Sequence, residues 1–164
     1  LADSNLSQQF AFEDGELHQV WGNKVPLVNT SESGKRGVQC LKNALVLNAP
    51  VGSTVDIKER ILLSWYGQEV KIAATGLIHK WEPTLGVKVG RLAVQKMKSK
   101  WGSCNVENGN IRLNSELAKF PEAALEHVVV HEMVHLLEPS HSKRFYSLMD
   151  QFLPNWKAMK ALTS

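Results

Sequence analysis

The amino-acid sequence predicts an α+β fold in which short strands come first and buried helices follow. In the first third, turn signals such as Asp14-Gly15 and Trp21-Gly22 separate short apolar segments, which is typical of strands. Between residues 57 and 77, apolar residues recur at near-helical spacing. The segment 123–137 is apolar on nearly every side, which is typical of a buried helix.

Length and composition fit one structural domain with its own core. The chain has 164 residues, of which 43% are hydrophobic and 21% are charged, as in ordinary globular proteins. We expect a β-rich N-terminal part over residues 1–50 and a mainly helical part over residues 51–164. The net charge of +3 is too small to indicate a nucleic-acid partner by itself.

Neither a membrane partner nor a signal peptide is expected. The chain has no run of about 18 apolar residues. Residues 1–10 lack both a basic start and an apolar stretch, so we expect a cytoplasmic location. The chain begins with Leu1 rather than Met, which leaves open that residues precede it. Cys40 and Cys104 lie far apart and are expected to be reduced thiols, with a disulfide as the alternative.

Alternating apolar residues and turn signals predict several further strands. They are Val25–Val28, Val38–Leu47, Val87–Val89, Leu92–Val94 and Asn110–Leu113. The polar stretch 29–37 is expected to be a loop, and Gly90 allows a bend. Asn108-Gly109 is suited to the turn that leads into the last strand.

Three helices and a short fourth one are expected after residue 50. Ser53 or Thr54 is suited to cap the first helix, which continues to about Lys80, before a turn at Pro83–Gly86. The second helix begins at Pro121 and ends at Glu138-Pro139. The third covers about Ser142 to Phe152, and Pro154 begins the short terminal helix.

The most informative motif is His131-Glu132-Met133-Val134-His135, on the predicted buried helix. Two histidines four residues apart lie on one face of a helix, so both imidazoles can bind one metal ion. Glu132 lies beside them, where its carboxylate can accept a proton from an attacking water. Buried histidines need partners, and this pair is hard to satisfy without an ion. The motif predicts a zinc hydrolase site with one Zn²⁺ per chain.

A catalytic zinc site needs a third protein ligand and leaves one position for water. His141 is the strongest candidate, because Pro139 ends the helix and lets the chain turn back. Glu138 is the rival, but it follows His135 closely and is less free to turn inward. The spacing of the three histidines matches the H-E-x-x-H-x-x-G-x-x-H pattern of metzincins. Glu138 replaces the glycine of that pattern, and no methionine turn is evident.

The other histidines have weaker assignments. His127 lies one turn before His131 and is expected beside the metal site or facing the substrate, with an ordinary polar position as the alternative. His18 and His79 belong to no motif and are expected at the surface. An oxyanion stabiliser is expected among residues close in sequence: Tyr146, Arg144 and His127.

The segment from Lys96 to Asn105 is the second unusual feature. Its alternating lysines and Trp101 suit contacts with phosphates and a base. The alternative is a strand with one solvated lysine face and a tryptophan packed on the core. The candidate substrate contacts or supports of the metal site are His127, Trp101, Ser103, Arg112 and Tyr146.

Three segments together carry a family resemblance. They are Lys98-Ser99-Lys100-Trp101-Gly102-Ser103-Cys104, Gly109-Asn110-Ile111-Arg112-Leu113-Asn114, and the zinc motif with His141-Ser142-Lys143-Arg144-Phe145. This combination resembles the YgjP-like, SprT-related family of metallopeptidase domains. The resemblance is strong from about Tyr66 to Trp156 and weaker before that.

The resemblance implies a compact zincin-like domain with an active-site helix, a small sheet and an N-terminal β part. It implies the ligands His131, His135 and His141 and the catalytic Glu132, so that residues 51–164 form the catalytic part. It leaves the substrate open. Many relatives are described only as predicted metal-dependent hydrolases, some are encoded beside type I restriction systems, and a bacterial relative is assigned UTP pyrophosphatase activity.

The leading interpretation is a zinc metallopeptidase that acts on peptides or proteins, held by an edge strand at Asn110–Leu113 or near Trp101. One alternative is a nucleotide pyrophosphohydrolase, although no glycine-rich phosphate loop is present. Its phosphate-binding residues would be Lys96, Lys98, Lys100 and Arg112. Another alternative is a non-catalytic, zinc-stabilised module of a DNA-processing complex, such as a restriction–modification system. Cys104 is expected to be a buried thiol rather than an inhibitory thiolate.

Overall fold

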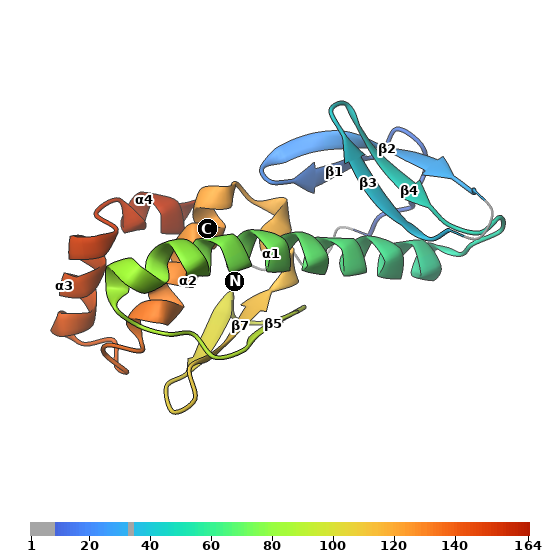
Figure 1. The fold of residues 1–164 in the computed structure, drawn as a ribbon. Helices are drawn as coiled ribbons and strands as arrows, with labels where there is room; N and C mark the ends of the chain where they lie inside the picture. Colours follow the sequence, from blue (N-terminus) through green and yellow to red (C-terminus); the bar gives the residue numbers. More distant parts are fainter. Residues whose placement is uncertain (1–8, 33–34) are drawn as a thin grey trace.

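Two small β-sheets and one long helix organise residues 9–32 and 35–164, the part of the chain that the computed structural model describes (Figure 1). The first sheet contains β1 (Leu17–Val20), β2 (Asn23–Thr30), β3 (Gly37–Leu41) and β4 (Ala44–Asn48), in the order β1-β2-β4-β3. The second contains β5 (Leu92–Gln95), β6 (Gly102–Asn105) and β7 (Asn110–Asn114), in the order β5-β7-β6. The architecture is α+β, as the sequence predicts.

Helix α1 (Val55–Leu85) runs along both sheets. The Thr54 hydroxyl accepts a hydrogen bond from the Ile57 N–H and so caps its start. Gly86, with a φ of 70°, ends it. Buried residues recur every three or four positions along the helix: Leu62, Tyr66, Val70, Ala74, Ile78, Trp81 and Leu85. Figure 1 shows the first half of α1 beside the four-stranded sheet and its second half beside α2 and the three-stranded sheet.

Helix α2 (Glu122–Val134) is buried over almost its whole length. It follows the short 3₁₀ helix η2 (Ser115–Lys119) and packs against α1 and the three-stranded sheet. Two C-terminal helices, α3 (Lys143–Phe152) and α4 (Trp156–Ala161), also pack against it. These neighbours explain why apolar residues lie on nearly every side of α2.

The tip of the β1–β2 hairpin lies against the start of α2. The Trp21 N–H donates to the Ala118 carbonyl at 2.7 Å, just before this helix. The Gly22 N–H donates to the Lys119 carbonyl at 3.1 Å. Gly22 has a φ of 87°, and a Cβ there would lie 2.8 Å from Pro121 Cγ, so only glycine fits. The N-terminal sheet is therefore fixed to the segment that begins α2.

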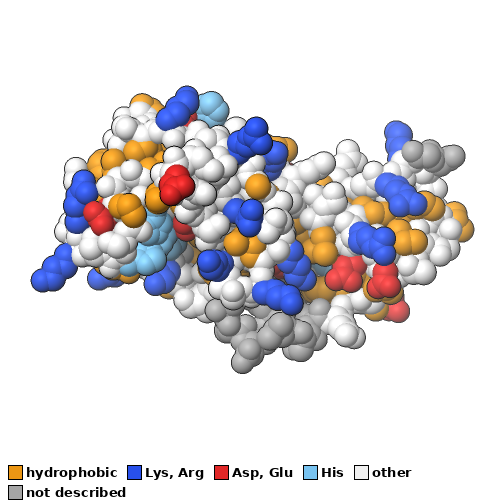
Figure 2. All heavy atoms as spheres, turned by 90° about the horizontal axis from the view of Figure 1, so that it is seen from below, with side chains coloured by type: hydrophobic (Ala, Val, Ile, Leu, Met, Phe, Trp, Pro, Cys, Tyr) orange, Lys and Arg blue, Asp and Glu red, His pale blue; other side chains and the backbone are white. Residues whose placement is uncertain are grey.

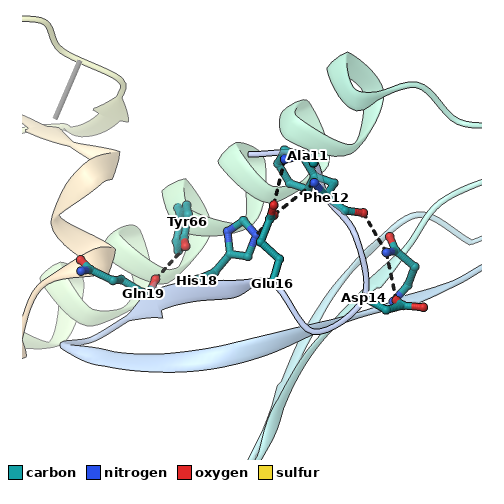
Figure 3. A network of polar contacts seen from close by, with 8 residues as sticks. Ala11, Phe12, Asp14, Glu16, His18, Gln19 and Tyr66 are labelled. Atoms are coloured by element: carbon teal, nitrogen blue, oxygen red, sulfur yellow. Dashed lines mark hydrogen bonds and ion pairs between the residues drawn. The ribbon is translucent and has the colours of Figure 1, made fainter. Parts of the chain in front are cut away.

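His18 is buried, so the prediction that it lies at the surface is wrong. Its side chain is 1% exposed, and its ring centroid lies 4.2 Å from that of Phe10 and 5.4 Å from that of Phe12. Its Nε2 lies 2.6 Å from Glu16 Oε1. The Glu16 carboxylate also accepts the N–H groups of Ala11 and Phe12 (Figure 3). A loop folded round a side chain in this way produces no periodic pattern in the sequence. His79 is exposed, as predicted.

Two of the predicted strands differ from the structure. The segment 38–47 is a hairpin rather than one strand, because Lys42-Asn43 forms a turn between β3 and β4. The segment 87–89 is not a strand. The Val89 N–H donates to the Glu82 carboxylate at 2.9 Å, so it is not available to a strand ladder.

The first predicted helix ends later than expected. Helix α1 continues past Lys80 and through Pro83, because Trp81 and Leu85 extend its buried face. Pro83 has no N–H to donate to the His79 carbonyl, so the helix lacks one backbone hydrogen bond near its end. The turn at Asn108-Gly109 and helix α3 lie where they are predicted, with Gly109 at a φ of 76°, whereas the last helix begins at Trp156 rather than at Pro154.

Within the described ranges, no helix is both long enough and apolar enough to cross a membrane. Residues 33–34, in the predicted loop over 29–37, lie outside the described residues, as do residues 1–8, where no signal peptide is expected. Strand β2 itself continues to Thr30.

The two parts of the chain should unfold together, because one buried cluster contains residues of both sheets and of α1. The Tyr66 hydroxyl, on the buried face of α1, donates to the Gln19 carbonyl at 2.7 Å (Figure 3). We expect Tyr66→Phe to lower the free energy of unfolding by about 1 kcal/mol in a single transition, because it removes this hydrogen bond. Urea unfolding followed by fluorescence and circular dichroism measures this, with the exposed Tyr146→Phe as control. Separate transitions for the two signals would contradict it.

Burial of His18 should make the protein less stable in acid. Burial lowers the pKa of His18 below its usual 6.5, while the unfolded chain keeps the usual value. Between the two values the unfolded chain binds more protons, so the free energy of unfolding should fall as the pH drops below 6.5. We expect His18→Gln to flatten this slope in thermal melts between about pH 5 and pH 8. Exposed His79→Gln is the control, and equal slopes in both variants and the wild type would exclude a contribution of His18.

Candidate metal centre

Helix α2 positions two of the predicted metal ligands. His131 lies in its last turn, and His135 lies at its C-cap. The helix ends at Val134 rather than at the predicted Glu138, but His135 keeps helical φ and ψ of −60° and −21°. The spacing of four residues therefore still places both imidazoles on one face, with ring centroids 5.1 Å apart.

The chain turns back after α2 and brings a third histidine to this pair. The Nε2 of His141 lies 3.1 Å from the Nε2 of His131 and 3.1 Å from the Nε2 of His135. Nitrogen ligands at 2.0–2.1 Å from a tetrahedral zinc ion are about 3.3 Å apart. These three side chains, called here the three-histidine group, therefore have the spacing of ligands that share one ion, and they can hold a metal.

Burial keeps the imidazoles of His131 and His135 neutral. Burial lowers the pKa of His131 to about 3 and also lowers the pKa of His135. A neutral imidazole retains the lone pair that a metal ligand needs. The Nδ1–H of His135 donates to the Glu138 carbonyl at 3.2 Å, which leaves the lone pair of its Nε2 free to bind a metal.

Phe145 packs against the rings of all three histidines and is not among the predicted site residues. It is fully buried, and its ring centroid lies 4.8, 4.6 and 5.0 Å from those of His131, His135 and His141. The Ser142 hydroxyl caps α3 by accepting the Phe145 N–H, which places this phenylalanine in the first turn. In the sequence, a single phenylalanine in a predicted helix cannot be told from any other core residue.

Glu132 lies next to β6. Its side chain is 7% exposed, and burial raises its pKa to about 7, while the charge of Lys100 acts to lower it. A carboxyl group with a pKa near neutrality can both accept and release a proton at pH 7. A Cβ at Gly102 would lie 2.9 Å from Val128 Cγ1 and 3.2 Å from Glu132 Cγ. Strand β6 therefore comes this close to Glu132 because residue 102 is glycine.

A cavity of about 700 Å³ opens at the three-histidine group. Residues in and around β6 form one wall, and residues of α3 and α4 form another. Beyond the histidines and Glu132, its lining includes the segment 100–104, Val106, Val128, Pro139, Phe145, Tyr146, Met149, Trp156, Lys160, Thr163 and Ser164. The lining is mostly apolar with a few polar groups, as in many ligand sites.

His127 contributes to this cavity without joining the three-histidine group. Its ring stacks on Trp156, with a centroid distance of 6.2 Å and an interplanar angle of 14°. Burial lowers its pKa to about 4, so the imidazole is neutral. Its buried Nε2 has no hydrogen-bond partner among the residues that the structure describes. An unpaired polar atom of this kind in a cavity wall is available to a ligand.

The structure brings most of the predicted substrate contacts into the cavity: Trp101, Ser103, His127 and Tyr146. Arg112 does not line it. This arginine lies on the central strand β7 and is exposed, on the face opposite to buried Ile111 and Leu113. Of the lysines predicted to bind phosphate, Lys100 lines the cavity, whereas Lys96 and Lys98 do not.

Glu138 and Arg144 bind each other outside the cavity. Arg144 Nη1 donates to Glu138 Oε2 at 3.2 Å and to the Leu137 carbonyl at 3.1 Å. The Glu138 carboxylate also accepts the Ser140 hydroxyl at 2.8 Å. Glu138 is not part of the group that can hold a metal, and Arg144, a predicted oxyanion stabiliser, does not line the cavity.

Cys104 lines the cavity as a neutral thiol. Burial raises its pKa to about 11, and the charge of Glu132 acts in the same direction. A protonated thiol is a poor metal ligand, so the raised pKa of Cys104 does not favour an inhibitory thiolate. Cys40 and Cys104 are both free thiols, as predicted.

Strand β6 is an open edge of the three-stranded sheet beside the cavity. Of the two predicted edge strands, Asn110–Leu113 is wrong, because β7 lies in the centre of this sheet, whereas the segment near Trp101 contains the edge strand β6. The Asn114 N–H donates to the Trp101 carbonyl, so the backbone groups of Gly102 and Cys104 point away from β7. Among the residues that the structure describes, none pairs with these outward N–H and C=O groups, so an unpaired strand edge borders the cavity at the three-histidine group.

Two solved structures resemble part of the chain. One is the metallopeptidase zymogen jannalysin of Methanocaldococcus jannaschii, with 17% identity and a TM-score of 0.48 over 54% of this chain and 85% of that chain. The other is the metallopeptidase zymogen abylysin of Pyrococcus abyssi, with 18% identity and a TM-score of 0.49 over 54% of this chain and 89% of that chain. No curated protein matches the chain.

The family of the chain follows from its sequence as a whole. Residues 2–163 match the model of the family described as "YgjP-like, metallopeptidase domain". The match includes the three-histidine group, Glu132 and β6, and it agrees with the resemblance of the motifs. The chain therefore belongs to the YgjP-like metallopeptidase domain family.

Proposed function

We propose that this protein is a zinc-dependent peptidase that cleaves peptides or proteins. The observation that carries the proposal is the convergence of three histidine Nε2 atoms beside the buried Glu132, in a cavity that borders a free strand edge. Membership in a metallopeptidase family supports the same class of reaction.

Zinc is the ion that suits these ligands. Three neutral imidazoles form a donor set of catalytic zinc sites, which keep one position open for water. Magnesium and calcium prefer oxygen ligands, which this group lacks. In our proposal His131, His135 and His141 hold one Zn²⁺. When bound, zinc lowers the pKa of water and polarises the carbonyl of the substrate.

Glu132 would move the proton in this reaction. Its carboxylate accepts a proton from the attacking water and passes it to the leaving amine, for which a pKa near 7 is well matched. Of the predicted oxyanion stabilisers, Tyr146 and His127 line the cavity. The Tyr146 side chain is 42% exposed, so its hydroxyl can turn toward a substrate.

The substrate would add a strand to β6. The outward backbone groups of Gly102 and Cys104 can pair with an extended peptide, which then passes close to Glu132. This pairing uses peptide groups that nucleotides lack, and Lys100 is the one predicted phosphate-binding residue in the cavity. The nucleotide substrate, the link to restriction–modification systems and the cytoplasmic location stay predictions.

Glu132→Gln should abolish peptide hydrolysis and keep the metal. Glutamine has nearly the same shape but cannot accept the proton, so we expect kcat to fall by about 100-fold or more. His131→Ala should instead lose zinc, because it removes one of three ligands. Elemental analysis and a fluorogenic peptide library measure both effects. A zinc-loaded wild type that cleaves no peptide, or a fully active Glu132→Gln variant, would show that the proposal is wrong.

Gly102→Ala should displace β6 and lower the activity without changing metal binding. The added methyl group would overlap Val128 and press on Glu132, so the strand must move away from α2. We expect kcat/KM to fall by about 10- to 100-fold with unchanged zinc content. Gly76→Ala on α1 is the control, because a Cβ there has no neighbour within 4 Å, and its activity should match the wild type. Full activity of Gly102→Ala would contradict the role of this close approach.

A further inference from the structure

Two lysines give the cavity a positive charge that its own side chains do not balance. Lys100 and Lys160 both line it, and Glu132 is the one acidic side chain in the described lining. Among the described residues, no carboxylate lies within 4.0 Å of either lysine. Arg144, by contrast, is paired with Glu138 at 3.2 Å. Unbalanced positive charge in a cavity attracts negative groups of a substrate.

The two lysines come from different walls of the cavity. Lys100 belongs to the segment that leads into β6, whereas Lys160 lies on α4. Trp156 and Lys160 are one turn apart on the same face of that helix, and both line the cavity. Figure 2 shows a group of histidine side chains at one end of the molecule with Lys and Arg side chains around it.

The charges of both lysines reach the candidate metal centre. Lys100 lines the same cavity as Glu132, and Lys160 lies on α4 one turn after Trp156, whose ring stacks on His127. Charges in these positions act on substrate groups bound between them. One lysine thus influences the β6 side of the centre and the other its α4 side.

We propose that Lys100 and Lys160 select peptides that carry acidic side chains on both sides of the cleaved bond. This inference rests on the proposed peptidase function. In this proposal a peptide paired with β6 passes between the two walls, with Lys100 facing the side chains on one side of that bond and Lys160 facing those on the other. Aspartate or glutamate there forms charge-assisted hydrogen bonds with a lysine, whereas lysine or arginine is repelled. A nucleoside triphosphate is the rival anion, but the free backbone edge favours a peptide.

Matched fluorogenic peptides test the proposal on the zinc-loaded full chain. The peptides differ only in having Glu, Gln or Lys before or after the cleaved bond, and kcat/KM is measured for each. We expect the Glu peptides to exceed the Lys peptides by about fivefold or more on each side. The difference should shrink as the salt concentration rises.

Charge-reversal variants assign each preference to one lysine. Lys100→Glu should reverse the preference on one side of the bond only, and Lys160→Glu should reverse it on the other. Lys100→Gln and Lys160→Gln should remove the preference without reversing it. Both lysines are exposed, so these variants should fold. Lys71→Glu, at an exposed position of α1 outside the cavity, is the matched control and should keep the order of the wild type.

Three outcomes overturn the inference. One is an unchanged order of peptides in both charge-reversal variants, and another is an equal loss for all peptides. Pyrophosphate release from nucleoside triphosphates that depends on both lysines, without any preference among peptides, also overturns it and favours a nucleotide.

A wild type that cleaves no peptide contradicts the proposed function. A binding measurement then tests whether the lysines still prefer acidic ligands. Calorimetry compares dipeptidyl hydroxamates that carry Glu or Lys, with acetohydroxamate as a control for binding at the metal alone. Tighter binding of the Glu compound that either Lys100→Glu or Lys160→Glu reverses supports the inference. Equal binding of the two compounds overturns it.

Discussion

The burial of α2 is the constraint on which the candidate metal centre depends. Apolar residues on nearly every side hold this helix between α1, the three-stranded sheet and the C-terminal helices: Ala124, Leu125, Val129, Val130, Met133 and Val134. Each large apolar side chain that is fully buried stabilises the fold by about 1.5–3 kcal/mol. This packing offsets the cost of keeping His131 and Glu132 largely away from water, and it leaves both side chains little freedom to move.

Burial shifts the pKa of the carboxyl group and the pKa values of the imidazoles in opposite directions. It lowers the pKa of His131 and His135 and raises that of Glu132, so each group is shifted toward its neutral form. Neutral imidazoles are ready to bind a cation, and a carboxyl group with a pKa near 7 is ready to exchange a proton. One packing arrangement therefore prepares two different chemical roles on a single helix.

The sequence was sufficient for features that depend on local spacing. The pair His131 and His135, the return of His141 and the hairpin turn at Asn108-Gly109 all follow from short-range geometry. Other features depend on which elements become neighbours. The place of β7 in the centre of its sheet, and the burial of Phe145 under three imidazoles, follow from tertiary packing that no periodicity in the sequence encodes.

The contact between the β1–β2 hairpin and the start of α2 decides whether the four-stranded sheet can be removed from this protein. No residue of the four-stranded sheet lines the cavity, so that sheet contributes no side chain to the candidate metal centre. Yet Trp21 and Gly22 provide the donors for the carbonyls of Ala118 and Lys119, and Gly22 covers Pro121. A fragment reduced to the catalytic part would expose these groups just where α2 begins. An engineer who seeks a minimal scaffold must therefore keep the hairpin to support the start of α2, although the hairpin does not line the cavity.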